Sequence, residues 1–72
     1  MNINAEIRAE LARQRLTYAD LAERLGTTRQ NIWRKLTSER TVHSDDLVLI
    51  ANVLDVPASE LMRRAEHSEV AA

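Results

Sequence analysis

The chain has 72 residues, enough for one small domain, and 44% of them are apolar. With a single Gly and a single Pro, the composition favours helices and predicts an all-α fold. The lack of Cys argues against a disulfide-bonded secreted protein, no apolar run approaches the ~20 residues of a membrane span, and the net charge of −1 does not by itself favour a nucleic-acid partner.

The first predicted helix spans about residues 4–14. Apolar residues recur at every fourth position between Ile3 and Leu11, as they do on the buried stripe of an amphipathic helix. Asn2 or Asn4 is suited to cap its first turn.

The second predicted helix has clear signals at both ends. Thr17 is a good N-cap, and Asp20 stands three residues later, where its carboxylate can accept a hydrogen bond from the cap amide. Gly26 ends the helix, because glycine adopts the left-handed conformation without strain. The residues that we expect to face inward are Leu21, Ala22 and Leu25.

A third helix follows at once. Thr27 and Gln30 repeat the spacing of a capping box, which predicts a helix from Thr27 to about Thr37. Ile32 and Leu36 mark its buried side.

The rest of the chain predicts two more helices. A polar loop leads to Ser44, which we expect to cap the fourth helix, and Asp55 ends that helix. Pro57 opens a short fifth helix, in a position where a missing amide hydrogen is harmless. We therefore expect one folded domain, residues 1–65, followed by a flexible tail, residues 66–72.

Charge is distributed unevenly along the chain. Residues 1–25 balance to zero, residues 26–40 carry +3 and residues 41–72 carry −4. The third helix therefore lies in the positive segment, and such a polarity orients a protein on a polyanion. The same pattern also fits an ordinary solvated surface, and charge alone does not separate the two.

The segment around the single glycine resembles a known family. The likeness is carried by a Leu-Ala pair, a Gly-Thr-Thr turn and apolar residues at set distances after it, namely Leu21-Ala22, Gly26-Thr27-Thr28, Ile32, Leu47, Ile50-Ala51, Leu54-Asp55-Val56 and Leu61. With a match from Leu11 to about Leu61, the chain is similar to the phage repressor and Cro family of helix-turn-helix proteins (XRE type). The resemblance implies a lambda-repressor-like bundle of five short helices that binds operator double-stranded DNA as a homodimer.

Two positions depart from the family pattern. Arg15 stands where the family often has Gly between the first two helices, which suggests a differently built turn. Lys35 replaces a residue that is usually apolar, and we expect Leu36 to take over its core contact.

Two arguments select the outward residues of the third helix. At ~100° per residue, the side opposite Ile32 and Leu36 holds Gln30 and Arg34. The resemblance implies four base-reading positions in the major groove of DNA, namely Thr28, Arg29, Gln30 and Arg34. Arg pairs with O6 and N7 of guanine, and Gln pairs with N6 and N7 of adenine.

Contacts to DNA phosphates are expected at helix N-termini and in the loop after the third helix, because free amides and cations attract anions. By resemblance, the start of the second helix is one such place. The candidates are Thr17, Tyr18, Asn31, Lys35, Thr37, Ser38 and Arg40.

Several of these roles have a structural alternative. Gln30 is also placed to complete the preceding cap, and Arg34 and Lys35 also fit plain solvated positions. Tyr18 is as well suited to packing on the bundle as to touching a phosphate. Trp33 fits an edge-of-core position as well as a DNA or interface role.

The sequence favours a transcriptional regulator, and repression over activation, because repression needs only occupancy of a promoter site. A homodimer would place its half-sites about one helical turn (~34 Å) apart, with Met62 and Val56 as candidate contacts between subunits. We expect such a protein in the cytoplasm, at the nucleoid of a bacterium or acting for a phage.

The alternative is a protein-interaction module, such as an antitoxin-like protein whose acidic rear binds a basic partner. The sequence has no phosphate-binding loop, no nucleophile flanked by a base and no metal-ligand spacing. We therefore expect no enzyme, no cofactor and no metal site.

Overall fold

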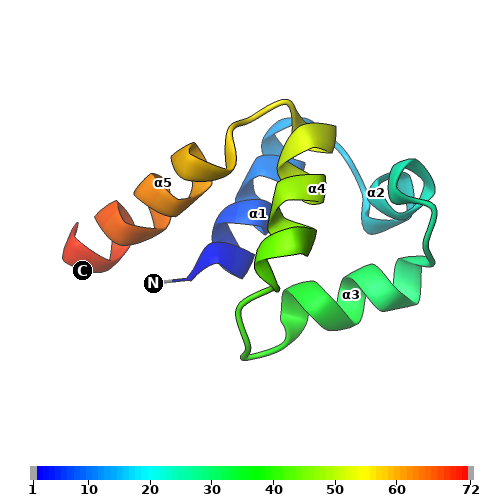
Figure 1. The fold of residues 1–72 in the computed structure, drawn as a ribbon, viewed down its shortest axis with the longest axis horizontal. Coiled ribbons are helices and arrows are strands. Elements are labelled where there is room, and N and C mark those ends of the chain that lie inside the picture. The colour runs from blue at the N-terminus through cyan, green and yellow to red at the C-terminus, as the bar shows by residue number, and fades with distance from the viewer. Residues whose placement is uncertain (1, 72) are drawn as a thin grey trace.

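The structure is a computed structural model that describes residues 2–71, with the side chains of residues 2–67. The described residues form five helices and no strand, which confirms the all-α prediction (Figure 1). The helices are α1 (Ile3–Arg13), α2 (Tyr18–Leu25), α3 (Arg29–Thr37), α4 (Ser44–Leu54) and α5 (Ala58–Ala71).

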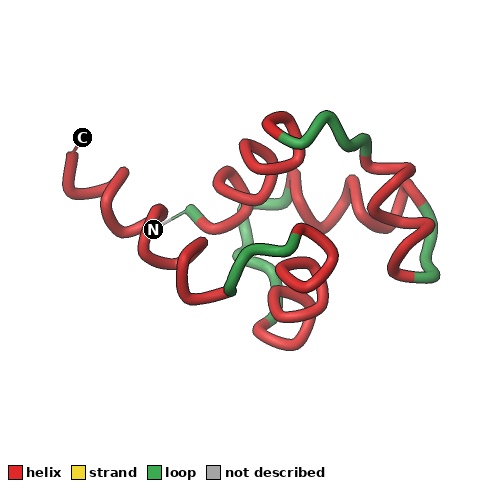
Figure 2. Tube along the Cα trace, turned by 90° about the horizontal axis from the view of Figure 1, so that it is seen from above, coloured by secondary structure: helices red, strands yellow, loops and turns green. Residues whose placement is uncertain are grey.

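The five helices close into a ring around one core. Each helix packs most extensively on two others, in the order α1, α5, α4, α2, α3 and back to α1. In Figure 1, α3 runs along the lower edge of the molecule and α5 extends at the left, and Figure 2 shows the same α5 projecting at one end. The helix that was expected to face outward is therefore a peripheral element with one side free.

The core draws on all five helices. Its largest fully buried side chains are Ile7, Leu21, Ile32, Leu36, Ile50, Leu54 and Leu61. They occupy the apolar stripes expected from the sequence, because each helix turns its periodic apolar residues toward the ring interior. Leu36 is fully buried, so the expectation that it takes over the core contact from Lys35 is confirmed.

Three helix ends share one geometry. Arg15, Gly26 and Asp55 have φ values of 57°, 72° and 57°, all in the left-handed region. In each case the next amide bonds to a carbonyl five residues back, as in a Schellman motif: Leu16 to Leu11 at 2.9 Å, Thr27 to Ala22 at 2.9 Å and Val56 to Ala51 at 3.1 Å. Arg15 therefore builds the turn that Gly would build, and the expectation of a different turn was wrong.

The cap of α3 lies one residue later than expected. Thr28, not Thr27, is the N-cap, and its hydroxyl accepts a hydrogen bond from the Asn31 amide at 3.1 Å. The Thr27 amide closes the end of α2, and the Thr27 hydroxyl accepts from the Asn31 side chain instead of a backbone amide of α3. Gln30 therefore does not complete a capping box at Thr27, and that alternative for its side chain is removed.

The caps of the last two helices also differ from the prediction. Nδ1 of His43 accepts from the Asp45 amide at 3.3 Å, so His43 is the N-cap of α4 and Ser44 is its first residue. α5 begins just after Pro57, whose carbonyl accepts from the amides of Glu60 and Leu61. Because α5 continues to Ala71, it includes most of the segment expected as a tail, and its flexibility stays a prediction.

Candidate nucleic-acid interface

The start of α2 is organised by a complete capping box. The Thr17 hydroxyl accepts from the Asp20 amide at 3.1 Å, and the Asp20 carboxylate accepts from the Thr17 amide at 3.0 Å. The Thr17 amide, which donates to the carboxylate, contributes most to lowering the pKa of Asp20 below its ordinary value, and the Thr17 hydroxyl contributes next. The other first-turn amides of a helix have no partner within the helix and remain available to an anion.

The outward side of α3 is free. Ile32 and Leu36 are buried against the core, while Arg29, Gln30 and Arg34 are exposed. The side chains of these three exposed residues make no hydrogen bond or ion pair with the described part of the protein. Three of the four expected base-reading residues are therefore free to bind an external ligand.

Thr28, the fourth expected base-reading residue, has a different status. It is exposed at the tip of α3, but its hydroxyl is already the cap acceptor for Asn31. A hydroxyl that accepts in a cap still has its own hydrogen to donate. Thr28 is thus placed beside the outward face, with its orientation set by the helix start.

Arg29 lines two neighbouring hollows, one at the start of α2 and one on the outward side of α3. With Leu16, Ala19 and the expected phosphate ligands Thr17 and Tyr18, it lines an open hollow of about 470 Å³ at the start of α2. It also lines a second hollow, of about 290 Å³, together with Gln30 and Trp33. Tyr18 is partly buried and packs against the core, so its ring supports the bundle while its backbone begins α2.

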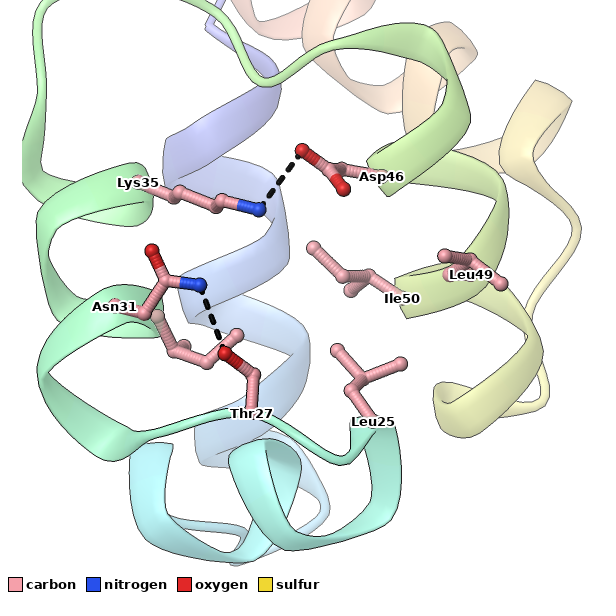
Figure 3. Close-up of a pocket in the computed structure, with 8 residues that line it drawn as sticks. Leu25, Thr27, Asn31, Lys35, Asp46, Leu49 and Ile50 are labelled. Atoms are coloured by element: carbon pink, nitrogen blue, oxygen red, sulfur yellow. Dashed lines mark hydrogen bonds and ion pairs between the residues drawn. The ribbon is translucent and has the colours of Figure 1, made fainter.

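Two expected phosphate ligands point elsewhere (Figure 3). Lys35 Nζ lies 3.0 Å from Oδ2 of Asp46, and Asn31 Nδ2 donates to Oγ1 of Thr27 at 2.8 Å. Both side chains line a cavity of about 170 Å³ between α3 and α4, not the outward face. Asp46, in the first turn of α4, is the ion-pair partner of Lys35.

The loop after α3 presents the remaining candidates. The Thr37 hydroxyl donates to the Trp33 carbonyl at 2.7 Å, and the Ser38 hydroxyl accepts from the Arg40 amide at 3.1 Å. Thr37 at the end of α3 is exposed, as are Ser38 and Arg40 in the loop, and the guanidinium of Arg40 has no partner among the described residues. Arg40 is therefore the free cation of this loop.

Asn4 is the residue that the sequence interpretation missed. Its side chain is buried, and its Nδ2 donates to the carbonyls of Arg40 at 2.7 Å, Ser38 at 3.2 Å and Lys35 at 3.3 Å. Its Oδ1 accepts from the Val42 amide at 3.1 Å. One asparagine on α1 thereby fixes the end of α3 and the loop that follows.

The sequence held one signal for this role. Asn4 stands three residues before Ile7 and seven before Leu11, so helical spacing places it on the buried stripe, where a polar side chain needs hydrogen-bond partners. It was considered as a cap instead, but Asn2 performs that task by accepting from the Ala5 amide at 3.0 Å. Arg8 adds a second support from α1, since its guanidinium donates to the carbonyl of Leu36 at the end of α3.

Comparison with known families decides the nature of this arrangement. The family model described as a helix-turn-helix domain matches residues 5–64. The chain belongs to this helix-turn-helix family. α2 and α3 are its two characteristic helices, joined at Gly26, and such a domain indicates DNA binding. No curated protein and no solved structure matches the chain.

The two arginines of α5, Arg63 and Arg64, are already paired with carboxylates. On α5, the guanidinium groups of Arg63 and Arg64 bind Glu60. They lower the pKa of that carboxyl to about 2, and Arg63 has the larger effect. Arg64 also reaches the buried Glu10 of α1 at 2.6 Å. Hydrogen bonds from Gln14, then from Arg64 and Arg13, lower the pKa of Glu10.

The cations of α5 are thus occupied, whereas Arg29, Arg34 and Arg40 have no partner among the described residues. Within the described residues, no group of three or more His, Cys, Asp or Glu is placed to hold a metal ion. None of the helices in residues 2–71 has the length and apolar character needed to cross a membrane.

Proposed function

We propose that this helix-turn-helix domain binds double-stranded DNA at specific sequences and regulates transcription, most simply as a repressor. The observation that carries the proposal is the free outward face of α3, where Arg29, Gln30 and Arg34 are exposed without protein partners. α3 would lie in the major groove, which is wide enough to admit a helix.

The base contacts follow from the chemistry of this face. Arg34 or Arg29 would pair with O6 and N7 of guanine, and Gln30 would pair with N6 and N7 of adenine. Thr28, at the tip of α3, is placed to donate its hydroxyl hydrogen to a neighbouring acceptor. The lack of internal partners supports these roles, because no protein contact has to be broken to form them.

The phosphate contacts would lie on either side of that groove. At the start of α2, Thr17 and Tyr18 line the same open hollow as Arg29, and the free amides of a helix start attract anions. After α3, Arg40 offers a free cation, with the hydroxyls of Thr37 and Ser38 beside it. We leave Asn31 and Lys35 out of the proposed set, because both side chains have partners inside the protein.

A homodimer on a pseudo-palindromic operator completes the proposal, since two-fold symmetric proteins match two-fold symmetric sites. Met62 is 43% exposed and suits a subunit contact, whereas Val56 packs partly against the core. Val48 and Leu49 on α4 are about half exposed and extend the choice of apolar contacts. DNA binding would place the protein in the cytoplasm, at the nucleoid.

The main alternative was a protein-interaction module of the antitoxin type. It would gain support if α3 were covered by another element of the fold. In the described residues, the outward side of α3 is exposed and lies beside the helix starts of α2 and α3, as DNA binding requires. This arrangement favours DNA as the partner.

The first test begins with selection of bound duplexes from random DNA. Arg34→Ala should lower affinity for the selected site by about 1–3 kcal/mol and relax the preference at one base pair. Arg63→Ala is the matched control, because Arg63 is an exposed arginine on α5, and its affinity for the site should be unchanged. Equal losses of Arg34→Ala on selected and random duplexes would refute base reading by Arg34.

The second test separates phosphate contacts from internal ion pairs. Arg40→Ala should weaken binding to all duplexes and reduce the slope of log K against log salt by about one unit. Lys35→Met should leave that slope unchanged, because the Lys35 ammonium is held by Asp46. A lower slope for Lys35→Met would return Lys35 to the set of phosphate ligands.

A further inference from the structure

Trp33 is an apolar side chain that the fold does not use. It is 52% exposed and does not pack against the core, although Ile32 and Leu36 of the same helix are fully buried. The expectation that Trp33 is an edge-of-core residue is therefore not supported. Its indole N–H also makes no hydrogen bond with the described residues. A large aromatic ring that is exposed to water often marks a binding surface.

The surroundings of Trp33 place it on the DNA-facing side of α3. It lines one hollow together with Arg29 and Gln30, two of the proposed base-reading residues. It does not line the cavity toward α4, where Lys35 and Asn31 lie. Gln30 and Trp33 are three positions apart, so their side chains lie close together on one face of the helix.

The charges around Trp33 indicate the chemistry of its partner. α3 carries Arg29, Arg34 and Lys35 and no acidic residue. In a symmetric dimer through this face, the same patch of both copies would meet and bring the two unpaired guanidinium groups of each together. A polyanion is attracted by the same charges, so the surface fits nucleic acid better than a second copy of the chain.

Only one base presents an apolar group in the major groove, namely thymine with its C5-methyl. We infer that Trp33 packs its ring against the C5-methyl of a thymine in the bound site and thereby contributes to sequence specificity. This inference rests on the proposed DNA binding and adds to it one apolar contact beside the polar ones. The thymine would lie at or next to the base pair that Gln30 contacts.

The test removes the methyl group and the ring separately. In the selected duplex, each thymine is replaced in turn by deoxyuridine, which lacks only the C5-methyl. Binding is then measured for the wild-type protein and for Trp33→Ala. At one thymine, the replacement should weaken wild-type binding about fourfold, the effect of exposing one buried methyl, and should leave Trp33→Ala unaffected. Asn52→Ala is the control, because Asn52 is exposed on α4 and lies outside the proposed DNA and subunit contacts, and it should respond as the wild type does.

The inference and the proposed function fail in different ways. If no sequence is enriched from random DNA, the proposed function fails, and this inference fails with it. If a site is selected but wild type and Trp33→Ala respond equally to every deoxyuridine, only the role of Trp33 is refuted. A selected site without thymine near the Gln30 contact would refute it as well. Circular dichroism of Trp33→Ala should show the wild-type fold, because the ring lies outside the core.

Discussion

Replacement of Asn4 by alanine tests how α3 and its following loop are held in place. The Asn4 side chain is only 3% exposed and bonds to four backbone groups between residues 35 and 42. Asn4→Ala removes both the donor and the acceptor. The three carbonyls and the Val42 amide would then have to find water or remain without a partner.

The size of the effect follows from the count of bonds. Nδ2 has two hydrogens for three carbonyls, so the longer bonds to Ser38 and Lys35, at 3.2 and 3.3 Å, share one of them. Together with the bonds to Arg40 and Val42 this gives the equivalent of about three hydrogen bonds, each contributing ~1 kcal/mol to stability. Asn4→Ala should therefore lower the free energy of unfolding by about 3 kcal/mol. In a domain of this size such a loss lowers Tm by roughly 10–25 °C.

Urea and thermal unfolding followed by circular dichroism measure this change. Asn52→Ala is the matched control, because Asn52 is exposed on α4 and its side chain has no partner among the described residues. Its stability should change by less than about 0.5 kcal/mol. If Asn4→Ala costs less than about 1 kcal/mol, water replaces the side chain and the claim that Asn4 fixes this loop is refuted.

Three further measurements test other parts of the structure. Gly26→Ala should lower stability by about 1 kcal/mol through its left-handed backbone alone, since an added Cβ meets nothing within 4 Å, and an unchanged urea midpoint would contradict this. Arg15→Gly should raise stability by up to about 1 kcal/mol, because glycine relieves the same left-handed strain and this outweighs the more flexible unfolded chain. The pKa of Glu10 is lowered in the fold, so the ionised carboxylate contributes to stability above the ordinary value of 4.5, and this contribution is lost as pH falls. Glu10→Gln should therefore be less stable than wild type at about pH 7, and the difference in stability should disappear in acid. A difference that does not depend on pH would refute the assignment.

The sequence by itself determined the local features of this protein. The capping box of Thr17 and Asp20, the left-handed turn at Gly26 and the buried stripe of α3 depend on residues within one or two turns of each other. Such interactions are set by spacing along a helix, and spacing is visible in the sequence. The exposure of Gln30 and Arg34 follows from the same periodicity, because burying Ile32 and Leu36 turns the opposite side outward.

Only the tertiary structure decided which polar side chains were free. Asn4 meets its partners more than 30 residues away, and Lys35 meets Asp46 across the gap between α3 and α4. Both contacts require α1 and α4 to be placed against α3, and that placement results from filling the shared core. Local spacing therefore assigned Lys35 to the outside and Asn4 to a cap, whereas packing between distant helices paired the first with an aspartate and made the second the anchor of the loop.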